Sequence, residues 1–293
     1  MYMSLSPGAI GIRGLALPES IALARRSGFA GVSVALPELR ELAEQRGTGA
    51  IRELFTQAGV APASWGLPFD WGPSELWESA LRSLPEFCTL ATDLGCQRAT
   101  LVMPSGSNER TYAENFAWHV ARIQPIAEIL RDHRCRLGIE YIGPETYRAT
   151  FKHEFIYNLG GLMELISAIG TGNVGVLLDS YHLYTSGGTM TDLDQLSAED
   201  VVVVHVNDAP ADVPRAAQMD LVRALPMETG VIDLPTFIGK LNAMGYDGPV
   251  MPEPFSARIN TLAATDPDAA AREVAASMTS LWRAAGLALS DGE

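Results

Sequence analysis

Four polar residues stand where apolar runs end, between positions 140 and 253 of the chain. The run 174–178 is short, partly β-branched and followed at once by Asp179, and similar runs end in Glu140, His205 and Glu253. Short apolar runs without alternation predict strands that are buried on both faces, as in a parallel sheet. Three carboxylates and an imidazole brought to one place need a cation, and hard oxygen ligands with a single imidazole favour Mn²⁺ or Mg²⁺ over a thiolate-type zinc site. The four residues therefore predict one divalent metal ion, with Zn²⁺, Co²⁺ or Fe²⁺ as alternatives.

The segments that must position these residues alternate between strand-like and helix-like patterns. Strands are expected at residues 9–15, 31–36, 60–68, 97–103, 136–141, 174–178, 201–206 and 249–251. Helices are expected at residues 17–27, 37–58, 74–94, 112–133, 160–169, 234–244 and 267–285, with a short one after the sixth strand. Eight strand–helix units in 293 residues, with no hairpin pattern, predict an α/β fold in which a closed (β/α)8 TIM barrel forms one domain over residues 1–293. A doubly wound open sheet is disfavoured, because no Gly-x-Gly-x-x-Gly loop follows the first predicted strand.

The composition narrows the kinds of partner. The formal net charge of −14 and the pI near 4.8 would repel a nucleic-acid backbone. The three cysteines, Cys88, Cys96 and Cys135, lack metal-type spacing and are expected to be buried in a reducing compartment. No signal-peptide pattern is seen, and no run approaches the ~18 apolar residues of a membrane span. We therefore expect a soluble cytoplasmic protein with a small-molecule substrate, and neither nucleic acid nor membrane as a partner.

The motifs around the four residues resemble those of the xylose isomerase-like TIM-barrel superfamily of sugar isomerases and epimerases, which also contains endonuclease IV. The matching segments are Gly138-Ile-Glu140, Leu178-Asp179-Ser-Tyr-His182, Val204-His205-Val-Asn-Asp208, Glu228-Thr-Gly230 and Glu253-Pro254. The resemblance implies that Glu140, Asp179, His205 and Glu253 hold one metal ion. It also implies that Glu140 and Glu253 move a proton through a metal-bound enediolate, in an isomerase or epimerase acting on a small polyhydroxy carbonyl compound. A homo-oligomer is an expectation from the resemblance alone.

Elementary chemistry agrees with this expectation. A metal that polarises a carbonyl and the adjacent hydroxyl makes the neighbouring C–H more acidic, and a carboxylate on each face can remove and return the proton. A lyase or dehydratase, such as an inosose dehydratase or an enzyme that eliminates from a 3-keto-glycoside, remains the alternative. A metal-stabilised sugar-binding protein is disfavoured, because binding alone does not need two acid/base carboxylates. A DNA-repair endonuclease is also disfavoured, since the fourth predicted strand ends at Met103 and not at a histidine.

Seven further residues are candidates for binding the substrate: His182, Lys152, His153, Trp65, Asn207, Arg215 and Glu228. His182 shares a strand end with Asp179, so it would bond a substrate hydroxyl or support the metal ligands. Asn207 and Asp208 would do the same, or form a turn. Epimerases of this superfamily place an arginine a few residues after the histidine of the seventh strand. Arg215 lies somewhat too far along the chain to match that position.

Loops supply the other candidates. Lys152 and His153 lie in a long loop after the fifth predicted strand and would cover the barrel mouth, or simply be solvated. Trp65, together with Phe69 and Trp71, would stack on a sugar face, or pack within its loop. Epimerases of this superfamily usually have a Gly-Glu-Gly loop after the seventh strand, and Glu228 belongs to an altered form of that loop.

Overall fold

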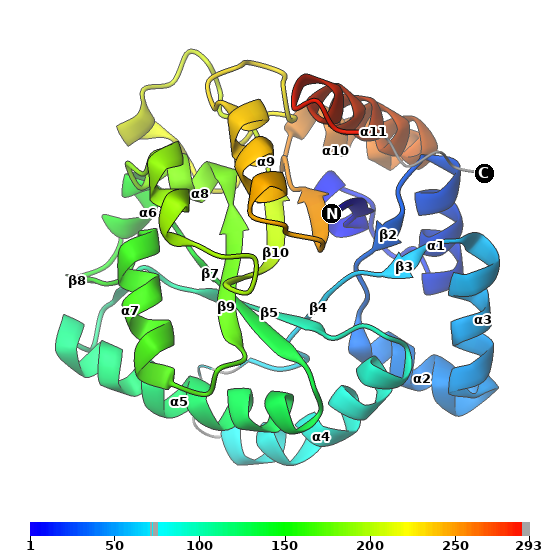
Figure 1. The fold of residues 1–293 in the computed structure, drawn as a ribbon, viewed down its shortest axis with the longest axis horizontal. Coiled ribbons are helices and arrows are strands. Elements are labelled where there is room, and N and C mark those ends of the chain that lie inside the picture. The colour runs from blue at the N-terminus through cyan, green and yellow to red at the C-terminus, as the bar shows by residue number, and fades with distance from the viewer. Residues whose placement is uncertain (71, 73–75, 289–293) are drawn as a thin grey trace.

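Parallel strands form a curled sheet at the centre of the molecule, and helices cover its outside (Figure 1). The computed structural model describes residues 1–70, 72 and 76–288. The sheet consists of β1 (Tyr2–Leu5), β2 (Gly31–Val32), β3 (Ala61–Pro62), β4 (Trp65–Gly66), β5 (Arg98–Met103), β7 (Arg136–Tyr141), β9 (Val174–Asp179), β10 (Val201–Val206) and β11 (Pro249–Pro252). Their order is β3-β2-β1-β11-β10-β9-β7-β5-β4, and every pairing is parallel.

The two end strands of this order close the sheet into a ring. β3 and β4 are separated by only two residues, so they are two halves of one segment. The first half bonds to β2, where Ala63 N donates to Val32 O (2.9 Å). The second half bonds to β5, where Leu67 N donates to Thr100 O (3.1 Å). The ring therefore has eight strand positions, which confirms the predicted (β/α)8 barrel.

Helices follow the strands and bury their apolar stripes against the outer face of the barrel. They are α1 (Leu17–Arg26), α2 (Leu36–Arg46), α3 (Thr48–Ala58), α4 (Trp77–Asp93), α5 (Tyr112–Asp132), α6 (Glu145–Arg148), α7 (Leu159–Ile169), α8 (Ser180–Thr185), α9 (Leu234–Ala243), α10 (Ala257–Thr265) and α11 (Pro267–Ala284). Three 3₁₀ turns, η1 (Pro7–Ile10), η2 (Met190–Gln195) and η3 (Arg215–Ala217), lie in loops. None of the helices in the described part of the chain is long and apolar enough to cross a membrane.

The interior of the barrel has a small apolar core of its own, formed by Ala63, Leu177, Val202, Val203 and Met251. Val202 sits at an irregularity in the β9·β10 register and fills space opposite Gly138, where an added Cβ would lie 3.1 Å from the Val202 Cβ. At the amino end of the strands, Arg98 donates to Val202 O (2.7 Å). The apolar core and Arg98 fill the interior toward the amino ends of the strands. Polar side chains occupy the interior at the carboxyl ends.

Several predicted elements need correction. The first strand is β1 and not residues 9–15, because Pro7 starts the turn η1 and Gly11 then adopts a left-handed conformation (φ 82°). The predicted helix 37–58 is two helices, because Gly47 (φ 79°, ψ 148°) interrupts it. α10 was not predicted.

The sequence did not predict an antiparallel ribbon, which β6 (Gly106–Ser107) and β8 (His153–Glu154) form. This ribbon joins the loops after β5 and β7. The predicted start of the helix 74–94 and the candidate Trp71 lie outside the described residues. The three cysteines are buried and free, as predicted.

Candidate metal centre

Four neighbouring strands of the barrel carry the four predicted metal ligands. Glu140 lies on β7, Asp179 ends β9, His205 lies on β10 and Glu253 directly follows β11. His205 pairs in register with Asp179 and with Met251, a residue of the interior core. Side chains alternate between the two faces of a strand, so these four point into the barrel while their neighbours pack outward against helices. The regular ladder thus brings residues from distant parts of the chain to one mouth.

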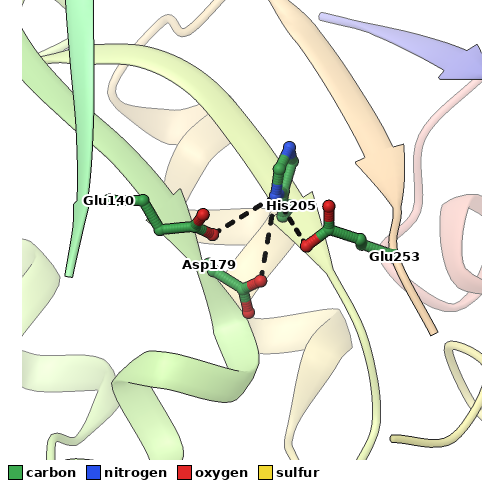
Figure 2. A group of neighbouring side chains, drawn as sticks. All are labelled: Glu140, Asp179, His205 and Glu253. Carbon is green, nitrogen blue, oxygen red and sulfur yellow. Dashed lines mark ion pairs between the residues drawn. The ribbon is translucent and has the colours of Figure 1, made fainter. Parts of the chain in front are cut away.

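The four side chains converge on one point (Figure 2). His205 Nδ1 lies 3.2 Å from Glu253 Oε2, 3.3 Å from Glu140 Oε1 and 3.9 Å from Asp179 Oδ2. One ligand atom from each residue lies within 4.8 Å of all the others. Figure 2 shows Glu140 and Glu253 approaching His205 from opposite sides. The arrangement therefore has two glutamates flanking a shared centre.

Burial and neighbouring charges shift the pKa values of these groups in different directions. Burial raises the pKa of Glu140 to about 7, against the opposing effect of His205. Burial also favours neutral Glu253, but His205 and Arg223 outweigh it and lower the pKa of Glu253. The pKa of Asp179 is lowered in the same way, by Arg223 and both nearby histidines. Burial disfavours protonated His205, yet Glu253 and Glu140 hold its pKa well above the usual value, which shows that the site attracts positive charge.

Arg223 was not predicted, and it lies directly against the cluster. Its Nη1 donates to Asp179 Oδ2 (2.7 Å) and to Glu253 Oε2 (3.2 Å), and its side chain is only 2% exposed. Burial lowers its pKa, but Asp179 and Glu253 outweigh burial and raise it. Between Asn207 and Asp233 the chain has only two basic residues, Arg215 and Arg223. That scarcity is the one sequence signal that could have suggested Arg223.

Asn207 and the start of α8 hold two of the carboxylates in place. The Asn207 amide donates to Asp179 Oδ2 (3.2 Å) and accepts from Glu253 N (2.7 Å), so it fixes two strand ends at once. Asp179 Oδ1 accepts from Tyr181 N (2.6 Å) at the start of α8. This leaves Asp179 Oδ2 facing the cluster. Asn207 is fully buried, and its hydrogen bonds hold two of the predicted ligands in position.

His182 is buried beside the cluster. Its Nδ1 accepts from Gly143 N (3.2 Å), and its Nε2 lies 3.1 Å from Arg223 Nη2 and 3.9 Å from Glu140 Oε1. Burial lowers the pKa of His182 to about 4, so the ring is neutral near pH 7. With Nδ1 as the acceptor, a neutral ring carries its proton on Nε2, so His182 faces Glu140 as a donor and cannot accept from Arg223.

The donor set fits a divalent cation. Glu140 Oε1 and His205 Nδ1 are buried, and neither has a hydrogen-bond partner within the described residues. Buried polar atoms are normally paired, so both atoms are suited to a ligand that the protein does not supply. Three carboxylate oxygens and one imidazole nitrogen are ligands that Mn²⁺ and Mg²⁺ accept, and that Zn²⁺ also tolerates.

The remaining predicted residues are not brought to the cluster. Trp65 is 1% exposed in the outer core, and its Nε1 donates to Cys96 O (2.9 Å). Arg215 is exposed on η3, and Glu228 is partly exposed and accepts from Leu225 N (2.7 Å). These placements do not support a role in binding the substrate for Trp65, Arg215 or Glu228.

The outer ribbon holds the last two candidates. Lys152 is exposed beside β8, and His153 is half-buried within it. β8 lies at the periphery of the molecule (Figure 1). Their contact with a substrate stays a prediction.

Known proteins share this fold. The model of the family described as "xylose isomerase-like TIM barrel" matches residues 21–281. A xylose isomerase domain protein from Alicyclobacillus acidocaldarius is 31% identical, with a TM-score of 0.87 over 98% of this chain and 99% of that one. A crystal structure of the IOLI protein with a binding zinc atom has the same fold at 16% identity, with a TM-score of 0.77 over 98% of both chains.

A curated relative points in the same direction. An inosose isomerase from Halalkalibacterium halodurans is 28% identical over 142 residues, which cover 48% of this chain and 47% of the relative. The chain thus matches about half the length of that relative. The family match extends over most of the chain, and the barrel and its strand order agree with it. The chain belongs to the xylose isomerase-like TIM-barrel family.

Proposed function

We propose that this protein is a divalent-metal-dependent isomerase or epimerase that acts on a small polyhydroxy carbonyl compound. The observation that carries the proposal is the pair of glutamates on opposite sides of His205, each within 3.3 Å of its Nδ1. Proton removal and return at a carbon beside a carbonyl need one acid/base group on each face. Keto-inositols are the first substrates to test, because a curated relative is named inosose isomerase. Ketoses come next.

The proposed metal ligands are Glu140, Asp179, His205 and Glu253. When bound, a divalent cation would polarise the substrate carbonyl and the adjacent hydroxyl. Mn²⁺ or Mg²⁺ suits the oxygen-rich donor set, and the zinc atom of the IOLI structure adds Zn²⁺ to the ions to be tested. Arg223 and His182 lie against the ligands and would bond the oxygens of the substrate.

The two glutamates differ in a way that suits opposite roles. The pKa of Glu253 is lowered, so its carboxylate is ionised and can accept a proton from the carbon beside the carbonyl. In the site without metal, burial raises the pKa of Glu140 to about 7, which makes Glu140 the more readily protonated of the two glutamates. Return of a proton to the same carbon from the opposite face gives an epimer. Return to the neighbouring carbon gives an isomer.

Two measurements test the proposal. The first is metal content, with thermal stability in the presence and absence of chelator, for the wild type and for Glu140→Gln, Asp179→Asn, His205→Ala and Glu253→Gln. We expect about one equivalent of divalent metal in the wild type, reduced in the variants. The second is uptake of solvent deuterium at the carbon beside the carbonyl of keto-inositols and ketoses, followed by analysis of products.

The outcomes separate the candidate classes. Deuterium uptake with an isomeric or epimeric product supports the proposal, whereas loss of water or of another group would identify a lyase. Metal binding without deuterium uptake would indicate a binding protein. A protein that binds no divalent metal at all would contradict the proposed mechanism.

A further inference from the structure

A cavity lies at the end of the barrel that also carries the metal centre. It has a volume of about 320 Å³, and its walls come from the loops after β4 and β5 and from the first turns of α5. Polar and aromatic side chains line it, among them Asp70, Arg110, Asn115 and Trp118. Its size falls at the lower end of the range for small-molecule sites, about 300–1,000 Å³. None of these four residues contacts the predicted metal ligands in the bonds described above.

Val102 connects this cavity with the metal centre. It lines the cavity, and it is the register partner of Glu140 in the β5·β7 pairing, so both side chains point to the interior face of the barrel. Paired residues on neighbouring strands are about 4.8 Å apart. Val102 is on the inner face and is 51% exposed. A molecule held at Glu140 is therefore one strand away from the cavity.

The side chain of Asn115 gives the cavity wall a buried donor that has no acceptor among the described residues. Its side chain is 1% exposed, and its Oδ1 accepts from Arg110 Nε (2.9 Å). A guanidinium only donates, so this bond fixes which end of the amide is oxygen. The Nδ2 atom has no hydrogen-bond partner within the described residues. Unpaired buried amide groups are rare, so the geometry leaves Nδ2 for an acceptor that enters the cavity.

The other walls indicate what kind of acceptor fits. Arg110 lies over the Trp118 ring, with Cζ 4.2 Å from its centroid, which holds the guanidinium in place. Asp70 contributes a carboxylate that can accept a hydrogen bond. Donors and an acceptor together suit hydroxyl groups, which both donate and accept. One positive and one negative side chain suit an uncharged ligand better than an anion.

We propose that the cavity binds a second sugar-sized unit of the substrate, whose carbonyl-bearing unit lies at the metal centre. The preferred substrate is then a keto sugar linked to another polyhydroxylated unit, and not a free monosaccharide. This inference rests on the proposed function for the position of the first unit. Asn115 and Arg110 are the residues that determine the preference.

The test compares a ketodisaccharide with its monosaccharide. Deuterium uptake is measured for lactulose, isomaltulose and D-fructose, with the wild type, Asn115→Leu and Arg110→Gln. Asn115→Leu keeps the volume of the side chain and removes the donor, and Arg110→Gln is a milder change at the rim. Arg131→Gln, an exposed position in the last turn of α5, is the matched control. We expect a lower KM for at least one disaccharide in the wild type, raised about tenfold in both variants, with kcat unchanged and the KM for D-fructose altered less than about twofold.

Equal KM values for both kinds of sugar in the wild type, or equal changes for both in the variants, would overturn the inference. If the wild type takes up no deuterium from these sugars or from keto-inositols, the proposed function fails and the cavity is tested by calorimetry with lactulose and Mn²⁺. Lactulose binding that weakens in Asn115→Leu but not in Arg131→Gln supports the cavity. Absence of binding, or binding that neither variant changes, refutes it. Arg110→Gln keeps the test decisive if Asn115→Leu does not fold.

Discussion

The two arcs of the barrel differ in regularity and in what their strands carry. In the regular arc, β7, β9 and β10 have six residues each and pair with a single irregularity, at Val202, and together with β11 they supply the four converging side chains. In the other arc, β2, β3 and β4 have two residues each, and their ends carry no charged residue. A shift of one residue in a strand moves every side chain to the opposite face. Long paired strands are therefore needed where four side chains must meet, whereas short strands are enough where loops build a cavity wall.

The largest expected effect lies in the regular arc. Replacing Glu253 or Glu140 by glutamine keeps the shape of the side chain and removes an acid/base group. We expect deuterium uptake to fall about 10²–10⁴-fold in each variant. Glu228→Gln is the control, because Glu228 is partly exposed and lies outside the cluster. If Glu140→Gln or Glu253→Gln took up deuterium at the wild-type rate, the regular arc would not carry the proton transfer through both glutamates.

Arg223 makes the regular arc dependent on charge balance. In Arg223→Met, Asp179 and Glu253 lose their buried cation, and breaking such a pair costs about 3–5 kcal/mol. We expect that loss in the free energy of unfolding by urea when chelator is present, and a smaller loss when a divalent metal is present. The exposed Arg215→Met should change stability by less than about 0.5 kcal/mol. Equal destabilisation with and without metal would show that Arg223 and the metal do not compensate the same charge.

Acid should destabilise both arcs through buried histidines. Burial lowers the pKa of His119, which lies on α5 in the cavity wall, to about 4. It lowers the pKa of His182, beside the metal centre, to about the same value. The unfolded chain binds a proton at each below about pH 6.5, while the folded chain does not until about pH 4. Stability is therefore complete above pH 6.5 and falls as the pH approaches 4, by about 3 kcal/mol for each histidine.

The variant His119→Phe isolates one of these contributions. Its free energy of unfolding should fall less steeply than that of the wild type between pH 6.5 and 4, and added metal should not alter the difference. Metal binding has its own pH dependence, because the ligands must lose protons. Identical pH profiles for the variant and the wild type would mean that His119 is not neutral in the folded protein.

A smaller effect is expected for Asn207, which positions two ligands without being one. Asn207→Ala removes the hydrogen bonds to Asp179 and to the backbone of Glu253, and losses of this kind typically weaken metal binding about 10–100-fold. Isothermal titration with Mn²⁺ measures the change. The control is Asn242→Ala, an exposed position on α9. Unchanged affinity in Asn207→Ala would mean that the strand ladder alone fixes the ligands.

The sequence predicted the regular arc better than the irregular one, for a physical reason. Runs such as 201–206 are long and apolar, so their pattern survives in the structure. β1 has only four residues, and the neighbouring segment 9–15 is more apolar than polar, but Pro7 and Gly11 prevent it from forming a strand. The break at Gly47 was missed because helical periodicity continues across it. Short strands depend on their partners, which a local pattern does not reveal.

The candidate site divides in the same way. The four converging residues were found because each ends a recognisable run. Arg223 was missed because its place depends on the loop after β10, which is held by the Asp208–Ala224 bridge and by Asp208 accepting from Gly230 N (2.7 Å). Trp65 was expected to stack on a sugar face or to pack within its loop, and it pairs with Ala99, whose side chain belongs to the outer core. Its neighbour Gly66 occupies the inward position.

The smallest expected effect concerns the outer ribbon and tests where the site ends. Lys152 is exposed, and its backbone N donates to Asn108 Oδ1 (2.9 Å), a bond that Lys152→Ala retains. We expect stability to change by less than about 0.5 kcal/mol, and the KM in the deuterium assay to change less than about twofold. The ribbon joins the loop after β5, which lines the cavity, to the loop after β7, which follows the strand of Glu140. A tenfold rise in KM would therefore mean that the ribbon reaches the substrate, and that the two arcs contribute to one closed site instead of two adjoining ones.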